Sequence, residues 1–219
     1  MKYKIGLLLC VLVSGAHAQN INWSILKKDQ NNMAYSNFGY NFGVTSQLGY
    51  GYKFKTFRTI LLSADYSIPM GEKLLDDFKF RMGGQISIYD NKNLILSSKL
   101  SFVFRRHQTK LIRMANFGSE ASVILGYYKP KWHFAGEFGY DNSSFTHLTH
   151  SDEMKENFSS ISDGWFGASG GYFRYGIQGS KTIHPSFEIS VRVGGTMAKF
   201  KDKNPILPFY GQIGLSYWF

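Results

Sequence analysis

The chain has 219 residues, of which 43% are hydrophobic and 17% aromatic, with 23 Gly, one Cys and a formal net charge of +10. Many aromatic residues beside much glycine favour β-structure, because aromatic side chains fit a pleated sheet and glycine marks bends. The longest apolar run, Ile5 to Val13, has nine residues, whereas a membrane-spanning helix needs about 20. The composition argues against a helix bundle or a disordered chain and excludes a polytopic helical membrane protein.

The first 18 residues have the pattern of a secretory signal peptide. Lys2 and Lys4 precede the apolar run, and Ala16-His17-Ala18 forms a cleavage site, so the mature protein is expected to begin at Gln19. The single Cys10 lies inside the apolar run and is interpreted as filler. An exported chain without a remaining cysteine favours a bacterial envelope over a eukaryotic secreted protein.

The next segment, residues 19–35, is predicted to be a periplasmic extension or a short first strand, and residues 36–219 the barrel described below. Alternating apolar residues run from Phe38 to Phe54 with one parity throughout. This run fits two strands joined by a turn at Thr45-Ser46-Gln47, or one overlong strand. In the second case Ile21, Trp23 and Ile25 could supply a short strand. Both readings give ten strands, and eight remain if the N-terminal region packs elsewhere.

Eight further stretches of about ten residues or more alternate between apolar and polar positions, as strands do. They are Phe57 to Ile68, Phe78 to Tyr89, Asn93 to Arg105, Met114 to Tyr128, Lys131 to Phe145, Trp165 to Gly179, Ser186 to Ala198, and Pro208 to Phe219. This length suits tilted strands that cross a bilayer. The pattern predicts an all-β protein, a single transmembrane antiparallel up-and-down β-barrel with ten strands, or eight.

A soluble β-sandwich or lipocalin-like barrel also has alternating strands. The polar faces here combine small residues with scattered charges of both signs, and the apolar faces place large aromatics near strand ends. That arrangement fits an aqueous lumen and an aromatic girdle. A charged content of 18% is also low for a soluble barrel with a solvated outer face. The membrane barrel is therefore the favoured interpretation.

Turn residues divide the connections into two sets. Asp90-Asn91-Lys92, Lys129-Pro130-Lys131 and the Ile183-His184-Pro185 region are predicted as short periplasmic turns. The outer loops are predicted at Met70 to Asp77, Arg106 to Arg113, Asn142 to Gly164, and Phe200 to Leu207.

Charged residues on the polar faces would meet inside the barrel and form a lumen charge network. They are Lys79, Arg81, Lys99, Arg105, Glu120, His133, Glu137, Asp141, Arg174, Glu188 and Arg192. One interpretation is a salt-bridged plug that fills the lumen. The other is a narrow polar pore or small-ligand pocket, because glycines remove volume along the same faces.

Other chemistry is weakly indicated. His147, His150, Asp152 and Glu153 have spacing that could bind a divalent metal, but an exposed loop explains them as well, so neither a metal nor another cofactor is predicted. No nucleophile elbow occurs, and no enzyme is predicted. Basic residues of the outer loops would meet lipopolysaccharide phosphates, whereas nucleic-acid binding is not expected of an exported chain. They are Arg105, Arg106, His107, Lys110, Arg113, Lys199, Lys201 and Lys203.

The last seven residues, Ile213 to Phe219, end in Phe with apolar or aromatic residues at every second position. This tail resembles the C-terminal signature of bacterial outer-membrane β-barrel proteins, and the chain as a whole is similar to small barrels of Bacteroidota-type outer membranes. The resemblance implies recognition by the barrel assembly machinery through an assembly signal on the last strand. Its residues are Phe209, Ile213, Leu215, Tyr217 and Phe219.

The sequence therefore predicts a non-enzymatic structural or accessory protein of the outer membrane in a Gram-negative envelope. Its expected partners are outer-membrane lipid, lipopolysaccharide, the assembly machinery and a larger outer-membrane complex. The alternative is a narrow channel or small-ligand carrier for anionic or polar solutes.

Overall fold

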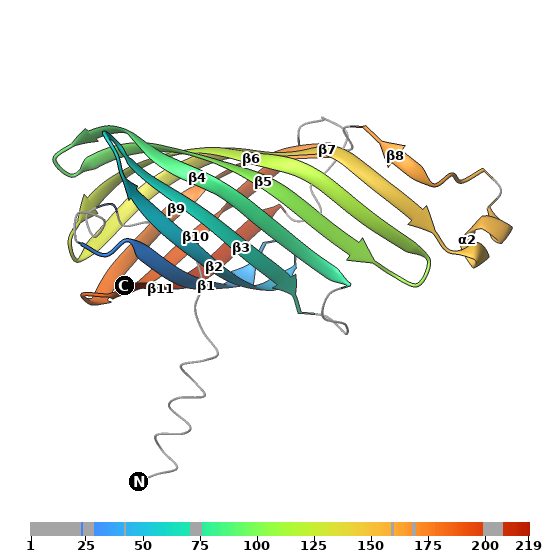
Figure 1. Ribbon diagram of the computed structural model, residues 1–219, viewed down its shortest axis with the longest axis horizontal. Coiled ribbons are helices and arrows are strands. Elements are labelled where there is room, and N and C mark those ends of the chain that lie inside the picture. The colour runs from blue at the N-terminus through green and yellow to red at the C-terminus, as the bar shows by residue number, and fades with distance from the viewer. Residues whose placement is uncertain are drawn as a thin grey trace, which may run out of the picture.

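The computed structural model describes residue 23 and residues 29–41, 43–70, 76–158, 160–167, 170–198 and 208–219. Ten antiparallel strands form a closed barrel, in which β1 pairs with β11, and an eleventh short strand, β8, adds to β7 (Figure 1). The predicted all-β up-and-down barrel is confirmed, with ten strands. The strands are β1 (Asn32–Tyr40), β2 (Val44–Lys55), β3 (Thr59–Pro69), β4 (Asp77–Asn91), β5 (Leu94–Gln108), β6 (Ile112–Lys129), β7 (Trp132–His150), β8 (Gly164–Phe166), β9 (Gly170–His184), β10 (Phe187–Ala198) and β11 (Phe209–Trp218).

The N-terminal alternating run is two strands, but the turn predicted at Thr45-Ser46-Gln47 is wrong. The chain reverses between Tyr40 and Val44, and Thr45 and Gln47 are buried in β2. Gly39 and Gly43 flank the reversal with φ of +152° and +150°, a backbone region that favours glycine. β1 begins at Asn32, inside the segment 19–35.

Trp23 is the one described residue of the predicted short strand at Ile21, Trp23 and Ile25. It lies in a turn and is buried in the barrel core. Ile21, Ile25 and the predicted signal peptide lie outside the described residues.

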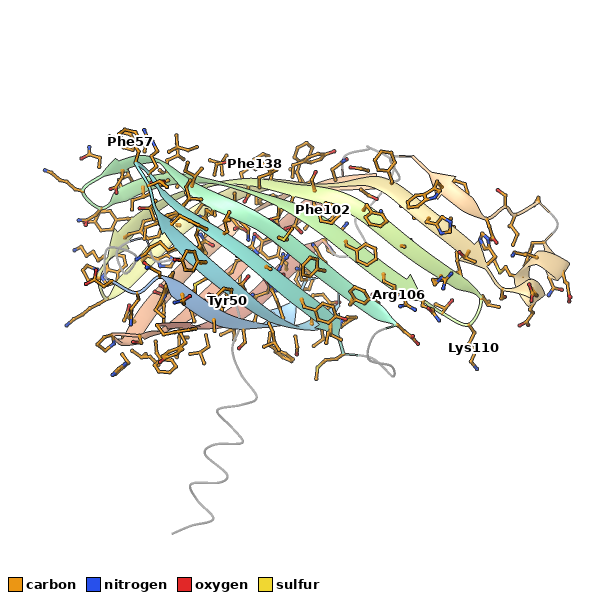
Figure 2. The ribbon with its side chains drawn as sticks, in the orientation of Figure 1. Tyr50, Phe57, Phe102, Arg106, Lys110 and Phe138 are labelled. Atoms are coloured by element: carbon orange, nitrogen blue, oxygen red, sulfur yellow. The ribbon has the colours of Figure 1, made fainter. Side chains whose placement is uncertain are left out.

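The alternation of the sequence separates the inside of the barrel from its outside. In β5, Ser97 and Ser101 are buried, whereas Leu100 and Phe102 are 62% and 47% exposed. Figure 2 shows Tyr50, Phe102 and Phe138 on the outside of the barrel. The polar faces thus form the interior and the apolar faces the outer surface, the reverse of a soluble barrel.

The barrel has two different ends. The end that we call the terminus-side end carries the C-terminus and the short β4–β5, β6–β7 and β9–β10 turns, at the three predicted places (Figure 1). The opposite, loop-side end carries the tight β1–β2 and β5–β6 turns and the longer β3–β4, β7–β9 and β10–β11 connections. There the described part of β6 and β7 continues past the other strands and carries β8 and α2 (Asp152–Asn157). We call this extension the lip: residues 112–118 of β6, residues 143–150 of β7, α2 and β8.

The lip corrects two predicted loops and one strand. The predicted loop Arg106 to Arg113 is only a tight turn, because β5 continues to Gln108 and β6 begins at Ile112. The predicted loop Asn142 to Gly164 contains the end of β7 and all of α2. Trp165 belongs to β8 rather than to one strand reaching Gly179. Across the described ranges, no helix has the length and apolar character to span a membrane.

Candidate functional site in the barrel lumen and on its outer belts

A network of buried ion pairs crosses the middle of the lumen. Arg81 on β4 donates through Nε to Asp65 Oδ1 on β3 at 2.8 Å, and its Nη1 lies 3.4 Å from Glu120 Oε2 on β6. Lys79 pairs with the other oxygen of Glu120, and its Nζ lies 3.4 Å from Asp141 Oδ2 on β7. These five residues are between 1% and 4% exposed. Four strands are therefore joined through the interior by side chains that water does not reach.

The network continues toward the loop-side end. Arg105 Nη2 lies 2.7 and 2.5 Å from the two carboxylate oxygens of Asp141, and Tyr172 donates to Oδ2 of the same carboxylate at 2.9 Å. Arg105 also donates through Nη1 to Asn116 Oδ1 at 3.2 Å. Its side chain is 24% exposed. The boundary between the filled interior and the loop-side solvent therefore lies near Arg105.

A second cluster lies on the opposite side of the lumen. Arg192 on β10 donates through Nε to Glu137 Oε1 at 2.7 Å, and Tyr210 on β11 donates to the same oxygen. The guanidinium carbon of Arg192 lies 5.0 Å from the centre of the Tyr210 ring. A Cβ on Gly176 or Gly194 would lie 2.3 or 2.4 Å from the Tyr210 hydroxyl oxygen, so glycine at both positions gives the ring its room.

The terminus-side part of the lumen is closed by an apolar cluster. It consists of Trp23, Met33, Tyr35, Leu61, Ile95, Ile124, Tyr128, Ala135 and Trp218. The ring of His133 stacks on Tyr128 at 4.9 Å between ring centres, and Ser180 lies 2.6 Å from His133 Nδ1. Trp23 precedes the barrel in sequence, so the N-terminal segment contributes a side chain to this closure.

All predicted network residues occupy strand positions that face the interior, but they do not form one cluster. Lys79, Arg81, Arg105, Glu120, Asp141 and Arg174 meet in the central network, whereas Glu137 and Arg192 form the second cluster. His133 and Glu188 lie 3.9 Å apart near the terminus side, measured from Nδ1 to Oε1. Lys99 is partly exposed and interacts electrostatically with both clusters.

Sequence reasoning missed several lumen residues. Asp65 completes the Arg81 pair, and Tyr172 and Tyr210 each bind a carboxylate. Lys53 is 1% exposed on the inner face of β2. The parity of the strands contained the signal, because Asp65 alternates in phase with Ser63 and Ser67 on the polar face.

The outer surface carries an aromatic belt near the loop-side end, which we call the loop-side girdle. Ring centres of successive members are 4.9 to 5.8 Å apart from β3 across to the lip. Its members are Tyr66, Phe78, Phe104, Phe117 and Trp165. Aromatic residues are typical of the level where a bilayer meets water.

A second belt, the terminus-side girdle, surrounds the other end. Tyr127 and Trp132 are in ring contact there, and the ammonium of Lys129 lies 5.6 and 5.7 Å from their ring centres. Phe187, Tyr217 and Phe219 continue the belt. From Phe117 to Tyr127 along β6, the chain advances about 33 Å along the strand and about 25 Å along the barrel axis, at a strand tilt of about 40°. That height is the apolar band of a transmembrane barrel.

Four residues of the predicted assembly signal lie on the outer face of β11, the strand that closes the barrel against β1, and the fifth, Phe219, directly follows the strand. They are between 37% and 56% exposed. The inward residues of the same strand include Tyr210 and Trp218, which are buried. The last strand therefore presents apolar residues to the outside, whereas its inward face carries Tyr210, Gln212 and Ser216 and contributes Trp218 to the apolar cluster.

In the lip, the histidines that were considered as possible metal ligands contact an aromatic ring and a carboxylate. His147 packs against the Trp165 ring at 4.9 Å, and His150 Nδ1 lies 2.9 Å from Asp163 Oδ1. Lys155 Nζ lies 2.7 Å from Asp163 Oδ2. Hydrogen bonds from Lys155 and from the His150 backbone hold the pKa of Asp163 well below its usual range. In the described part of the chain, no group of three or more His, Cys, Asp or Glu side chains could hold a metal ion.

Cations project from the outer rim beside the loop-side girdle. Arg106 is one outward position beyond Phe104 on β5, and donates through Nη2 to Gln108 Oε1 at 2.5 Å. Arg113 is exposed on β6, and Lys110 lies at the β5–β6 turn, farther along the loop-side end than Arg106 (Figure 2). A shallow depression of about 210 Å³ at this turn includes Lys110 and Arg113 in its lining. This rim is suited to anionic groups.

Comparison with known proteins finds no matching protein-family model and no matching curated protein. Among solved structures, the chain is similar to the Yersinia pestis outer membrane protein Ail in a phospholipid bilayer nanodisc, with 13% identity, a TM-score of 0.34, and coverage of 87% of this chain and 100% of Ail. It is also similar to mutants of the Rh. blastica porin, with 9% identity, a TM-score of 0.23, and coverage of 86% of this chain and 99% of the porin. At these TM-scores, the description of the fold rests on the strand pairing of the chain itself.

Proposed function

We propose that the chain is an exported bacterial outer-membrane β-barrel that serves as a structural or accessory protein of the envelope, with a lumen filled by its own side chains. The observation that carries the proposal is the buried ion-pair network across the lumen of a barrel whose outside is apolar. An apolar outside between two aromatic girdles about 25 Å apart supports a bilayer position. A soluble protein with so much exposed apolar surface would aggregate.

The burial of the central side chains supports a closed lumen. A water-filled passage would leave the side chains along its wall exposed, yet Lys79, Glu120 and Asp141 are at most 3% exposed. The paired charges offset the cost of their burial because the carboxylates of the two ion-pair clusters each receive several donors. The carboxylates of Asp65, Glu120, Glu137 and Asp141 are all engaged with cations, which supports a structural rather than an enzymatic role.

Lipid contacts follow from the same placement. Arg106 lies two residues beyond Phe104, which is about 5 Å farther along the barrel axis than the girdle. Lipid phosphates lie at that level when the girdle marks the interface. We therefore infer that Arg106 and Arg113 contact phosphate groups of outer-membrane lipid, in particular lipopolysaccharide.

The assembly machinery and a larger envelope complex are the proposed protein partners. The outward residues of β11 would supply the assembly signal, and removal of Tyr217 to Phe219 should prevent membrane insertion in cells. Normal insertion of this truncated chain would contradict the assignment. Exposed aromatic residues of the lip, Trp165 at 65% and Phe145 at 59%, offer apolar area for a neighbouring subunit.

A narrow anion channel is the second candidate, because described lumen cations outnumber lumen carboxylates. Two measurements separate the candidates. The protein is extracted from its native membrane in mild detergent and sized, and the purified barrel is then placed in a planar bilayer. A stoichiometric companion and no conductance steps support the accessory role. A lone barrel with anion-selective steps supports the channel.

A further inference from the structure

The charges that face the lumen do not balance. Among the described residues, seven cations occupy inward-facing strand positions against six carboxylates, so this part of the interior carries a surplus of one positive charge. The cations are Lys53, Lys79, Arg81, Lys99, Arg105, Arg174 and Arg192, and the carboxylates are Asp65, Asp77, Glu120, Glu137, Asp141 and Glu188. Uncompensated charge is expensive to bury in a poorly hydrated interior.

Arg174 on β9 is where the surplus is most evident. It is 5% exposed, and its Nη2 lies 3.7 Å from Glu120 Oε2. Its Nε and Nη1 are buried without a hydrogen-bond partner. Arg174 interacts electrostatically with Glu120, Glu137 and Asp141, but these carboxylates accept their hydrogen bonds from other residues, and the two Arg174 donors stay unsatisfied. A guanidinium has no acceptor atoms, so whatever satisfies these donors must be an acceptor.

The strand register places a second cation and two small residues beside Arg174. Arg174 pairs with Gly139, Gly139 with Ser122, and Ser122 with Lys99, so the four residues form one row across β9, β7, β6 and β5. A Cβ on Gly139 would lie 3.6 Å from Arg174 Nη2, so the guanidinium lies above the glycine. The row therefore has a long cationic side chain at each end, Arg174 and Lys99, and the two small residues Gly139 and Ser122 between them.

Lys99 adds to the positive field at its end of the row. It interacts electrostatically with Arg81 and Arg192 as well as with Asp65 and Glu120. Glu120 precedes Ser122 by two residues on β6, and Glu137 precedes Gly139 by two residues on β7. Each of these carboxylates is bound to an arginine or lysine of the two clusters. Charge and hydrogen-bonding capacity thus both favour an added anion above Gly139 and Ser122.

We propose that the lumen binds a small inorganic anion such as chloride between Arg174 and Lys99, above Gly139 and Ser122. The anion neutralises this cation surplus and accepts hydrogen bonds from Arg174. This inference rests on the proposed filled lumen, and it makes the anion a component of the plug rather than a permeating solute.

Chloride retention and chloride-dependent stability test this proposal. The refolded mature barrel is dialysed against radiolabelled chloride, and its thermal unfolding is followed in sodium chloride and in sodium gluconate at one ionic strength. We expect about one chloride per barrel and a melting temperature a few degrees higher in chloride, because a ligand of the folded state alone stabilises that state. Equal melting temperatures together with no retained chloride would overturn the proposal.

Variants locate the site. Arg174→Gln and Lys99→Gln should each lose the chloride-dependent shift and the retained chloride, whereas Lys181→Gln, an exposed lysine of the same strand β9, should keep both. If Arg174→Gln does not fold, Lys99→Gln and the wild-type dialysis still decide the matter. Chloride retained equally by both lumen variants contradicts the assignment. Planar-bilayer conductance tests the filled lumen independently of the anion site. A barrel that conducts no ions would support the filled lumen whether or not it retains chloride.

Discussion

Replacing Glu120 by glutamine should weaken the barrel more than any conservative change on its surface. Glu120 receives Lys79, Arg81 and Arg174 and is 3% exposed, so Glu120→Gln leaves three buried cations with less compensation. Removing one partner of a buried ion pair costs about 3–5 kcal/mol. Glutamine still accepts a hydrogen bond, so we expect a loss of about 3 kcal/mol in the free energy of unfolding. Urea unfolding in phospholipid vesicles, followed by tryptophan fluorescence, measures it.

Two further variants check the cause. Glu153→Gln makes the same chemical change on the exposed helix α2 and should alter stability by less than about 0.5 kcal/mol. Glu120→Gln combined with Lys79→Met removes a cation along with the carboxylate and should recover part of the loss. A loss below about 1 kcal/mol for Glu120→Gln, or a double variant no more stable than Glu120→Gln alone, would refute the reasoning.

Three other perturbations test the surface, the packing and the lip. Leu100→Arg, at a 62% exposed position of β5 between the girdles, should cost about 2–4 kcal/mol in vesicles, and a cost near zero would argue against a lipid-facing surface. Gly194→Val should prevent folding into a heat-resistant band on gels, because a Cβ there would lie 2.2 Å from the Tyr175 carbonyl oxygen and 2.4 Å from the Tyr210 hydroxyl oxygen; normal folding would show that these two groups are not held there. Because the pKa of Asp163 is lowered in the folded lip, its stabilising contribution is fully present above the ordinary carboxyl pKa and is lost progressively as the pH falls from there through the lowered value. At neutral pH, hydrogen exchange of residues 150–158 and 160–163 should therefore be slow in the wild type and fast in Asp163→Asn, and equal rates in both proteins would contradict this.

The inside and outside of the barrel could be predicted from the sequence, because side chains of a strand alternate regardless of what the strand pairs with. The first turn could not be placed by the same signal. Tyr40 and Val44 are an even number of residues apart, so the alternation continues across the reversal without a break. Only the positive φ angles of Gly39 and Gly43 identify the position of this turn.

The end of β7 was misplaced for the opposite reason. The register shifts where Phe117 pairs with Phe145 but Gly118 pairs with Ser143, so one residue of β7 is unpaired. This bulge reverses the parity beyond it, and the alternation stops although the strand continues. The ion pairs depend on the register and tilt of strands distant in sequence, as with Lys79 and Glu120, and the sequence alone does not contain that information.

Single-cysteine labelling along β5 tests the central claim most directly, because the only cysteine of the chain precedes the expected mature N-terminus. Fluorophores at Leu100 and Phe102 and at their neighbours Lys99 and Ser101 are exposed to spin-labelled lipid and to aqueous acrylamide, an uncharged quencher. A lipid-facing barrel with a filled lumen predicts strong lipid quenching at Leu100 and Phe102, and weak quenching by either agent at Lys99 and Ser101. Strong acrylamide quenching at the inward pair would show an open lumen, and equal lipid quenching at all four positions would contradict the barrel in the membrane.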